Sequence, residues 1–275
     1  MQEPQLSVVV PVYNEEASLP LLAGELAAAL AEVEGGYEVL FVDDGSTDGS
    51  AAVLARLAAE DPRVRVLRMP GNHGQSAALA AGFRHARGEL TASLDADLQN
   101  DPADLPRMLA AVDGVDVVCG VRARRRDTWV RRVSSRLANG VRNRVTHESI
   151  ADVGCTLRVY RTDVLRHLPL FDGMHRFLPT LLRMGGARIA EMPVNHRPRR
   201  YGKTKYGINN RLWRGIADLL AVRWMQSRWI DRRLVEEVAP WRAQRSGPSC
   251  GSGSALPVRG SSSAASSSSG SSPSG

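Results

Sequence analysis

The chain has 275 residues, of which 43% are hydrophobic and 24% charged, an ordinary composition for a soluble globular protein. Its three cysteines, Cys119, Cys155 and Cys250, lie far apart and no Cys/His cluster is present, which argues against a disulfide scaffold and a structural zinc site. We expect no signal peptide and no transmembrane helix, because the N-terminus lacks a cleavable pattern and no stretch reaches about 18 apolar residues.

The basic charge of the chain points to an anionic partner. The formal net charge is +7, and the only two lysines are Lys203 and Lys205. Between Arg122 and Arg144 there are nine arginines and one carboxylate, Asp127. Phosphate groups, nucleic acid and a membrane surface are the partners that such clustering favours.

The first 120 residues alternate between short apolar runs and helical patterns. We expect strands over residues 6–12, 37–42, 64–67, 89–94 and 115–119, and helices over 18–33, 48–59, 75–86 and 102–112. Ser18 is expected to cap the first helix. This rhythm predicts an α/β fold, in which a mostly parallel central sheet is covered by helices on both faces.

The second half of the chain has a less regular pattern. We expect a basic helix over residues 129–145, a helix over 175–184, and strands over 153–160 and 188–194. A further helix over 209–228 is amphipathic, and its Trp/Leu face is more typical of core than of a membrane surface, although its arginines would also suit binding at a membrane surface; the face consists of Leu212, Ile216, Leu219, Leu220 and Trp224. Residues 246–275 include 23 Ser, Gly or Pro residues and should be disordered.

Polar clusters follow three of the expected strands. They are Pro11 to Glu15, Asp43 to Asp48, and Asp95 to Gln99. Ligands of parallel sheets bind beyond the carboxyl ends of the strands, so these clusters should meet at one edge. Two carboxylates on a short loop, Asp95 and Asp97, suit Mg²⁺ or Mn²⁺ and imply a diphosphate ligand, with Gln99 as a further oxygen donor.

The motifs PVYNE, VDDGSTDGS, NHGQSAALAAGF and LDADLQNDP resemble the nucleotide-binding half of family 2 glycosyltransferases, which have the GT-A fold. Four later segments are similar to polyprenyl-phosphate glycosyltransferases, a group that includes dolichyl-phosphate mannose synthases and bacterial undecaprenyl-phosphate sugar transferases; they are residues 120–122, 131–136, 152–161 and 197–206. The resemblance covers about residues 6–225.

The resemblance also implies roles for individual residues. Asp95 and Asp97 would form the DxD motif and, with Gln99, hold Mg²⁺ or Mn²⁺. The phosphate of a lipid acceptor would be held by Arg122, Arg131 and Ser135, which together with the two aspartates make up the catalytic set. The nucleotide-sugar donor would be bound by Pro11, Tyr13, Glu15, Val42, Asp44, Asp95, Ala96, Arg199 and Lys205.

These roles predict an inverting, metal-dependent transfer of a hexose from GDP-mannose or a UDP-sugar to a polyprenyl monophosphate. The attacking phosphate oxygen is already ionised at neutral pH, so no general base is required. We expect a cytoplasmic enzyme, peripheral at the inner face of the membrane, that binds no nucleic acid. The expected organisation is a glycosyltransferase domain over 1–228 (donor half 1–120, acceptor half 121–206, amphipathic helix 207–228), a linker over 229–245 and a tail over 246–275.

Three alternatives remain open at this point. The acceptor could be a saccharide hydroxyl, although the QxxRW pattern of processive synthases is absent. The chain could be a nucleotidyltransferase, although PVYNE is not the glycine-rich loop of that class. It could also be a non-catalytic nucleic-acid-binding protein, although aromatic residues are only 5% and no basic-aromatic segment is present. We expect His73, His175 and His196 to be structural or surface residues, and Cys155 to be a small core residue.

Overall fold

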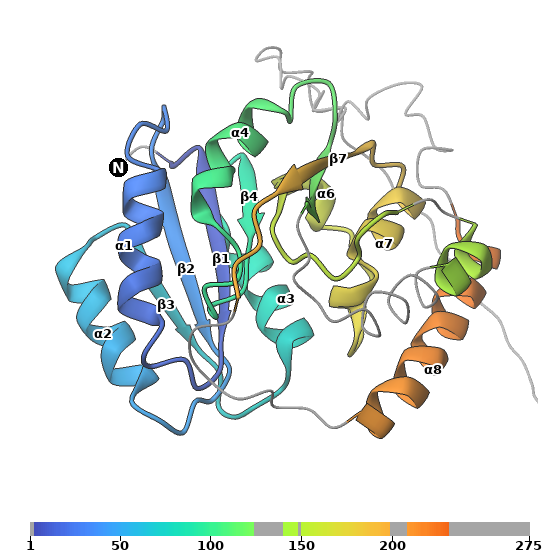
Figure 1. Cartoon of the computed structure of the whole chain (residues 1–275), viewed down its shortest axis with the longest axis horizontal. Helices are drawn as coiled ribbons and strands as arrows, with labels where there is room; N and C mark the ends of the chain where they lie inside the picture. The colour runs from blue at the N-terminus through green and yellow to red at the C-terminus, as the bar shows by residue number, and fades with distance from the viewer. Residues whose placement is uncertain (1–2, 124–139, 148–149, 199–207, 231–275) are drawn as a thin grey trace, which may run out of the picture. The chain divides into compact units, whose positions relative to one another are not determined.

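The computed structural model of the protein describes residues 3–123, 140–147, 150–198 and 208–230 (Figure 1). All of these residues belong to one unit, Met1–Leu234. The expected tail, most of the expected linker and most of the basic helix predicted over 129–145 lie outside the described residues, and only residues 140–146 of that helix are seen as helical.

A seven-stranded sheet with the order β3-β2-β1-β4-β6-β5-β7 forms the centre of this unit. Its strands are β1 (Leu6–Val12), β2 (Tyr37–Asp43), β3 (Val64–Arg68), β4 (Leu90–Ser93), β5 (Val117–Arg122), β6 (Arg158–Arg161) and β7 (Ile189–Val194). Every pairing is parallel except those of β6, which runs antiparallel to both β4 and β5. The predicted mostly parallel central sheet is therefore confirmed.

Helices cover both faces of the sheet, and strand alternation decides which core each side chain joins (Figure 1). In β1, Val8 and Val10 pack in one hydrophobic cluster and Val9 in the other, as the two-residue period of a strand requires. The first cluster contains residues of α1 (Leu19–Ala29), α2 (Ser50–Glu60) and α4 (Leu105–Ala110). The second contains residues of α3 (Gln75–His85), α7 (Leu178–Met184) and α8 (Ile208–Ser227).

Several predicted elements are shorter than expected, among them the first helix, which is Leu19–Ala29, and the helix predicted over 175–184, which is divided between a 3₁₀ turn and a helix over Leu178–Met184; two further cases have a local cause. The helix predicted over 102–112 is a 3₁₀ turn, η1 (Pro102–Asp104), followed by α4, because Pro106 has no N–H to continue a helix from η1. The strand predicted over 153–160 is only Arg158–Arg161. In the segment before β6, the carbonyl groups of Val153 and Thr156 accept side-chain hydrogen bonds in place of a regular strand ladder.

The first helix is not capped by Ser18. The Ser18 hydroxyl donates instead to the carbonyl oxygen of Glu15 at 2.9 Å and to its Oε2 at 3.1 Å. Beyond β6, the fold is completed by α6 (Thr162–Leu165) and by the 3₁₀ turn η2 (Met174–Arg176), which packs near α3.

The apolar face predicted on the last helix is wrong in its placement. Val222 is fully buried, with Leu219 and Met225 packed beside it, whereas Trp213, Leu220 and Trp224 are 72%, 61% and 64% exposed. Residues 219, 222 and 225 recur at helical spacing on one side, so the tryptophans fall on the opposite side. Among the described residues, no helix combines the length and apolar character needed to cross a membrane.

Candidate active site

The loops after β1 and β2 are joined by one asparagine. Asn14, whose φ of 54° is in the left-handed region, accepts hydrogen bonds at its Oδ1 from the amides of Thr47 at 2.7 Å and Asp48 at 3.3 Å. The amide of Glu15 donates to Ser50 Oγ at 2.9 Å. The first two polar clusters predicted from the sequence therefore lie together as one bonded unit.

Asp44 attaches a third loop to this unit. Its two carboxylate oxygens accept the amides of His73 at 2.7 Å and Gly74 at 2.8 Å. Gly45, with a φ of +67°, lies so close to Gly71 that a β-carbon there would overlap the backbone of Gly71. Buried Asp44 thus shapes the loop that enters α3, and its predicted contact with the donor remains a prediction.

The loop after β4 carries Asp95, Ala96 and Asp97 and is called the DxD loop here after this sequence. It has a strained backbone. Leu98 is buried with a φ of 61°, a conformation that costs a non-glycine residue about 1–3 kcal/mol. The amide of Gln99 donates to Asp97 Oδ1 at 3.2 Å, and Asp95 Oδ1 accepts from Gln75 Nε2 at 2.7 Å. Such strain persists only where the surrounding structure fixes the backbone, which is the situation of many ligand-binding loops.

The other predicted donor residues lie around these loops. Pro11, Tyr13 and Glu15 are half-buried at the end of β1. Val42 and Ala96 have their side chains in the hydrophobic clusters, so only their backbone groups could face a ligand.

The chain after β7 runs alongside the DxD loop. The amide of Arg197 donates to the carbonyl of Gln99 at 2.8 Å, and its guanidinium contacts Asp101 at 2.6 Å and Glu25 at 2.7 Å. This contact brings the chain as far as Pro198 beside the acidic loop. Arg199 and Lys205, the predicted diphosphate ligands, lie outside the described residues.

Arg122 is held by Asp152, a residue for which the sequence analysis predicted no role. Its Nε and Nη2 donate to the two oxygens of Asp152 at 2.7 and 2.8 Å, and its backbone amide donates to Asp152 Oδ2 at 3.2 Å. A side chain at Gly154 would collide with this guanidinium. In the sequence, the signal for this ion pair is that Gly154, which leaves room for the guanidinium, stands two residues after Asp152. Arg131 and Ser135, the other predicted acceptor ligands, lie outside the described residues.

Arg158 is another arginine near this site. Unlike Arg122, it had no role predicted from the sequence. It is fully enclosed, and its guanidinium donates to the carbonyls of Val153 at 2.8 Å and His175 at 3.4 Å. His175 Nδ1 in turn contacts Ser76 Oγ at 2.7 Å, which agrees with the hydrogen-bonded role expected for it. Arg158 therefore ties the loop around Asp152 to η2, next to the first turn of α3.

The buried cysteines do not fit the role of nucleophile. Burial raises the pKa of the Cys119 thiol to about 11 and also raises the pKa of Cys155. Both thiols are therefore protonated at neutral pH, and the thiolate is the reactive form. Cys155 is a core residue, as predicted.

The donor atoms of the DxD loop fit a hard divalent cation. Two carboxylates and an amide oxygen are ligands that Mg²⁺ and Mn²⁺ accept, provided that water or substrate phosphate completes the shell. The described residues contain no group of three or more His, Cys, Asp or Glu side chains arranged to hold a metal ion. With two carboxylates on one loop, Asp95 and Asp97 suit a cation shared with a phosphorylated ligand.

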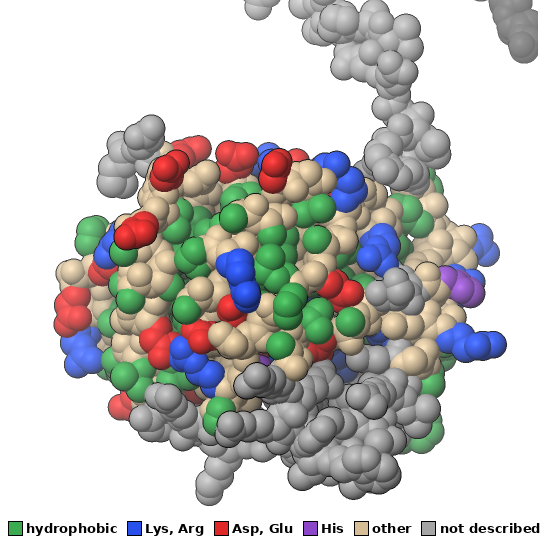
Figure 2. Space-filling model, turned by 45° about the horizontal axis from the view of Figure 1, so that its top comes forward, with side chains coloured by type: hydrophobic (Ala, Val, Ile, Leu, Met, Phe, Trp, Pro, Cys, Tyr) green, Lys and Arg blue, Asp and Glu red, His purple; other side chains and the backbone are tan. Residues whose placement is uncertain are grey.

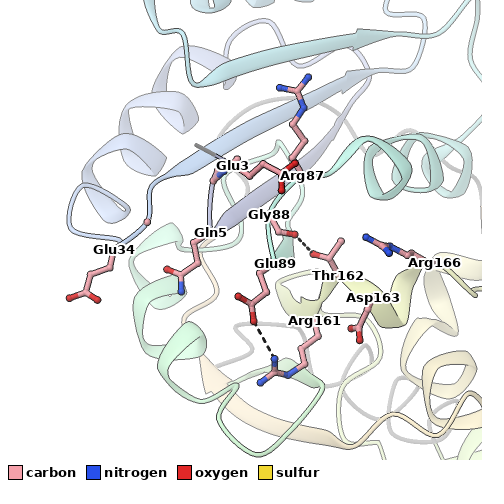
Figure 3. A pocket seen from close by; sticks show the side chains of 12 residues that line it. Glu3, Gln5, Glu34, Arg87, Gly88, Glu89, Arg161, Thr162, Asp163 and Arg166 are labelled. Atoms are coloured by element: carbon pink, nitrogen blue, oxygen red, sulfur yellow. Dashed lines mark hydrogen bonds and ion pairs between the residues drawn. The ribbon is translucent and has the colours of Figure 1, made fainter. Parts of the chain in front are cut away.

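A separate hollow of about 740 Å³ lies at the amino-terminal ends of the strands, near the first residues of β1 and β4 (Figure 3). Three arginines and four carboxylates line it, and Arg161 pairs with Glu89 at 3.5 Å. The face shown in Figure 2 likewise intersperses basic, acidic and apolar side chains. No described feature of this edge matches the predicted donor site.

A family model confirms the interpretation of the motifs. The model for glycosyl transferase family 2 matches residues 7–168, which is more than half of the chain. The chain belongs to glycosyltransferase family 2.

Curated relatives of this family 2 glycosyltransferase share one description. Undecaprenyl-phosphate 4-deoxy-4-formamido-L-arabinose transferase from Edwardsiella ictaluri is 44% identical over 206 residues, which cover 74% of this chain and 63% of the relative. The protein of the same description from Aeromonas hydrophila is 41% identical over 205 residues, again 74% of this chain and 63% of the relative. The chain thus spans less than two thirds of the length of these relatives.

Solved structures support the fold. Glucosyl-3-phosphoglycerate synthase from Mycobacterium tuberculosis, in complex with Mn²⁺, UDP and phosphoglyceric acid, superposes with a TM-score of 0.62 at 19% identity and covers 83% of this chain and 80% of that one. A mannosyltransferase from Pyrobaculum calidifontis, in complex with GDP-Man and Mn²⁺, gives a TM-score of 0.55 at 23% identity, covering 82% of this chain and 64% of that one.

Proposed function

We propose that this family 2 glycosyltransferase transfers a sugar from a nucleotide-diphosphate sugar to the phosphate of a polyprenyl monophosphate. The observation that carries the proposal is the strained DxD loop, which follows β4, contacts Gln75 beside the bonded loops after β1, β2 and β3, and lies beside the segment leading to Arg199. Its donor atoms suit a cation bound to a diphosphate. The relatives named as undecaprenyl-phosphate transferases support a lipid phosphate as the acceptor.

The donor half would bind the nucleotide sugar through Tyr13, Glu15 and the backbone near Val42, and the cation through Asp95, Asp97 and Gln99. A bound Mg²⁺ or Mn²⁺ would offset the negative charge of the leaving diphosphate. Arg199 and Lys205 would bind the same diphosphate from the other side, since guanidinium and ammonium groups are strong donors to phosphate oxygens.

The acceptor half would present the lipid phosphate to the sugar. Arg122, whose fork is oriented by Asp152, would act together with Arg131 and Ser135. An ionised phosphate oxygen is already a nucleophile, so the reaction depends on alignment and charge stabilisation, and a single in-line displacement inverts the anomeric carbon.

We further propose that the exposed face of α8 rests on an anionic membrane surface, at the inner face of the cell membrane. Trp213, Leu220 and Trp224 project from this face, and the exposed Arg223 and Arg228 lie on the same helix or directly after it. Tryptophan and leucine enter the headgroup region of a bilayer while arginine pairs with anionic lipids. This arrangement would keep a peripheral enzyme next to its lipid acceptor.

A transfer assay tests the proposal. The full chain is incubated with a panel of radiolabelled nucleotide sugars, a short-chain polyprenyl phosphate and Mn²⁺ or Mg²⁺, and the lipid is extracted. The panel includes hexose donors, as predicted from the sequence, and pentose donors, because the relatives are named for an arabinose derivative. We expect label in the organic phase with one donor and none in EDTA.

Label on an added saccharide, with none in the lipid, would contradict the lipid acceptor and favour a hydroxyl acceptor. Full activity in EDTA would contradict the metal. Salt-sensitive nucleic-acid binding without any binding of nucleotide sugars would contradict the whole assignment.

A further inference from the structure

The first turn of α3 carries a side chain to which the proposed function gives no role. Gln75 is the first residue of α3, and its Nε2 donates to Oδ1 of Asp95 at 2.7 Å. We propose that Gln75 is a positioning residue for Asp95, fixing the carboxylate so that the cation and the donor diphosphate meet it in one orientation. This inference rests on the proposed function, because it assumes that Asp95 serves a cation.

The chemistry of the contact suits that task. A carboxylate only accepts hydrogen bonds, so the glutamine must turn its NH₂ group toward Asp95. A neutral amide occupies one carboxylate oxygen without adding positive charge beside it. A lysine at the same position would form an ion pair with Asp95 and would compete with the cation.

The backbone that carries Gln75 is held on two sides. On one side, Asp44 accepts the amides of His73 and Gly74, the two residues immediately before Gln75. On the other side, the hydroxyl oxygen of Ser76 accepts the amide of Gly173 at 3.0 Å and contacts His175 Nδ1 at 2.7 Å, which joins α3 to η2. A side chain carried by a fixed backbone can orient its hydrogen-bond partner, whereas a side chain on a mobile loop would follow its partner.

The shape of the chain before α3 also serves this placement. Gly74 has a φ of +88°, a conformation that side chains rarely adopt, and the helix begins directly after it. The sharp turn lets the Asp44-bound amides and the Asp95-bound side chain come from adjacent residues. Asp44 and Asp95 are therefore connected through one short segment of the chain.

Mn²⁺ binding by the full chain tests the role of Gln75. Affinity is measured by electron paramagnetic resonance with UDP or with GDP present, for the wild-type chain and for Gln75→Ala, Gln75→Lys and Asp95→Ala. The matched control is Gln226→Ala, which loses one hydrogen bond from a glutamine Nε2, to the carbonyl of Thr146 at 2.9 Å. We expect Gln75→Ala to weaken Mn²⁺ binding by about 10- to 100-fold, the usual effect of removing a residue that orients a metal ligand.

Gln75→Lys should weaken Mn²⁺ binding more than Gln75→Ala does, whereas Gln226→Ala should bind as the wild type does. Thermal unfolding should change by similar small amounts in the two alanine variants, because each loses one hydrogen bond. Wild-type Mn²⁺ affinity in Gln75→Ala, with binding lost in Asp95→Ala, would overturn the role of Gln75 and leave the proposed function standing. Equal weakening by Gln226→Ala would also overturn it. Absence of Mn²⁺ binding by the wild-type chain would contradict the proposed metal site itself, and the role of Gln75 with it.

Discussion

The loops after β1, β2 and β3, in the proposed donor half, and the segment around Arg122, in the proposed acceptor half, are held by different kinds of contact. In the donor half, side chains bond to backbone amides: Asn14 to Thr47 and Asp48, and Asp44 to His73 and Gly74. In the acceptor half, the prominent contacts involve charge. Arg122 pairs with Asp152, Arg176 pairs with Asp218 on α8, and Arg158 is buried against carbonyl groups.

This difference bears on what each half has to do under the proposed function. A side chain that bonds to amides fixes the backbone of a loop, so the donor loops are shaped before any ligand arrives. An ion pair instead orients a charged group, and α8 adds an exposed apolar face to the same half. Such an arrangement suits a donor that must be held in one pose and an acceptor whose hydrocarbon chain stays in the bilayer.

The largest effect should come from the DxD loop. Asp97→Ala should lower transfer about 1,000-fold or more and abolish metal-dependent donor binding, because a charged ligand is lost from a preorganised site. The lipid-extraction assay and nucleotide binding with and without Mn²⁺ measure both. Asp113→Ala, at an exposed aspartate, is the control and should retain activity. Unchanged turnover in Asp97→Ala would remove the metal role from this residue.

The next largest effect should be a loss of stability when the ion pair between Arg122 and Asp152 is broken. Asp152→Asn leaves a largely enclosed guanidinium without its counter-charge and should lower the free energy of unfolding by about 3 kcal/mol. Denaturant unfolding measures the loss. The control is Asp61→Asn, which breaks an exposed pair with Arg63 and should cost less than about 1 kcal/mol. Equal losses in the two variants would show that the enclosed ion pair contributes no more to the free energy of unfolding than the exposed one.

A smaller effect should appear at the surface of α8. Trp224→Ser should weaken binding to vesicles that contain anionic lipid by about 10-fold, since a tryptophan side chain no longer enters the headgroup region. Co-sedimentation with vesicles measures this. Leu21→Ser removes an exposed apolar side chain from α1 and should leave vesicle binding unchanged. If both variants bind vesicles as the wild type does, α8 is not the membrane surface.

The smallest effect should distinguish, by its salt dependence, a carboxylate held by uncharged donors (Asp48) from one held by an arginine (Asp116). Burial opposes ionisation of Asp48 and Asp116, but hydrogen bonds from Ser50 and Glu16 in one case and from Arg188 in the other lower the pKa of each below 3.8. Lowered pKa values stabilise the fold above the unfolded-state value, and this contribution is lost as the pH falls below about 4. The lowered pKa of Asp116 depends on the positive charge of Arg188, which salt screens. Asp116→Asn should therefore reduce the fall in Tm at acidic pH by a smaller amount at high salt than at low salt. Asp48→Asn should act equally at both salt concentrations.

Much of the donor half could be predicted from the sequence. Short apolar runs bounded by turn residues predicted the strands. Because parallel strands bring their carboxyl ends to one edge of a sheet, Glu15, Asp44 and Asp97 could be predicted to lie in one region without coordinates. Local rules also explain the errors nearby. Pro106 breaks the expected helix because of its own missing N–H, a signal that was present in the sequence.

The remaining features depended on the tertiary structure, because they join residues far apart in the chain. Which oxygen of Asp95 meets Gln75, and which carboxylate holds Arg122, follow from packing between separate elements. The two apolar faces of α8 could not be ranked from its helical spacing, since both have it; the position of η2 and α7 decided that Val222 is buried and Trp224 exposed. The sequence by itself determined the family, the sheet and the edge where the chemistry is proposed to lie. The tertiary structure decided how each charged group at that edge is held, because those contacts are between segments that share no local pattern.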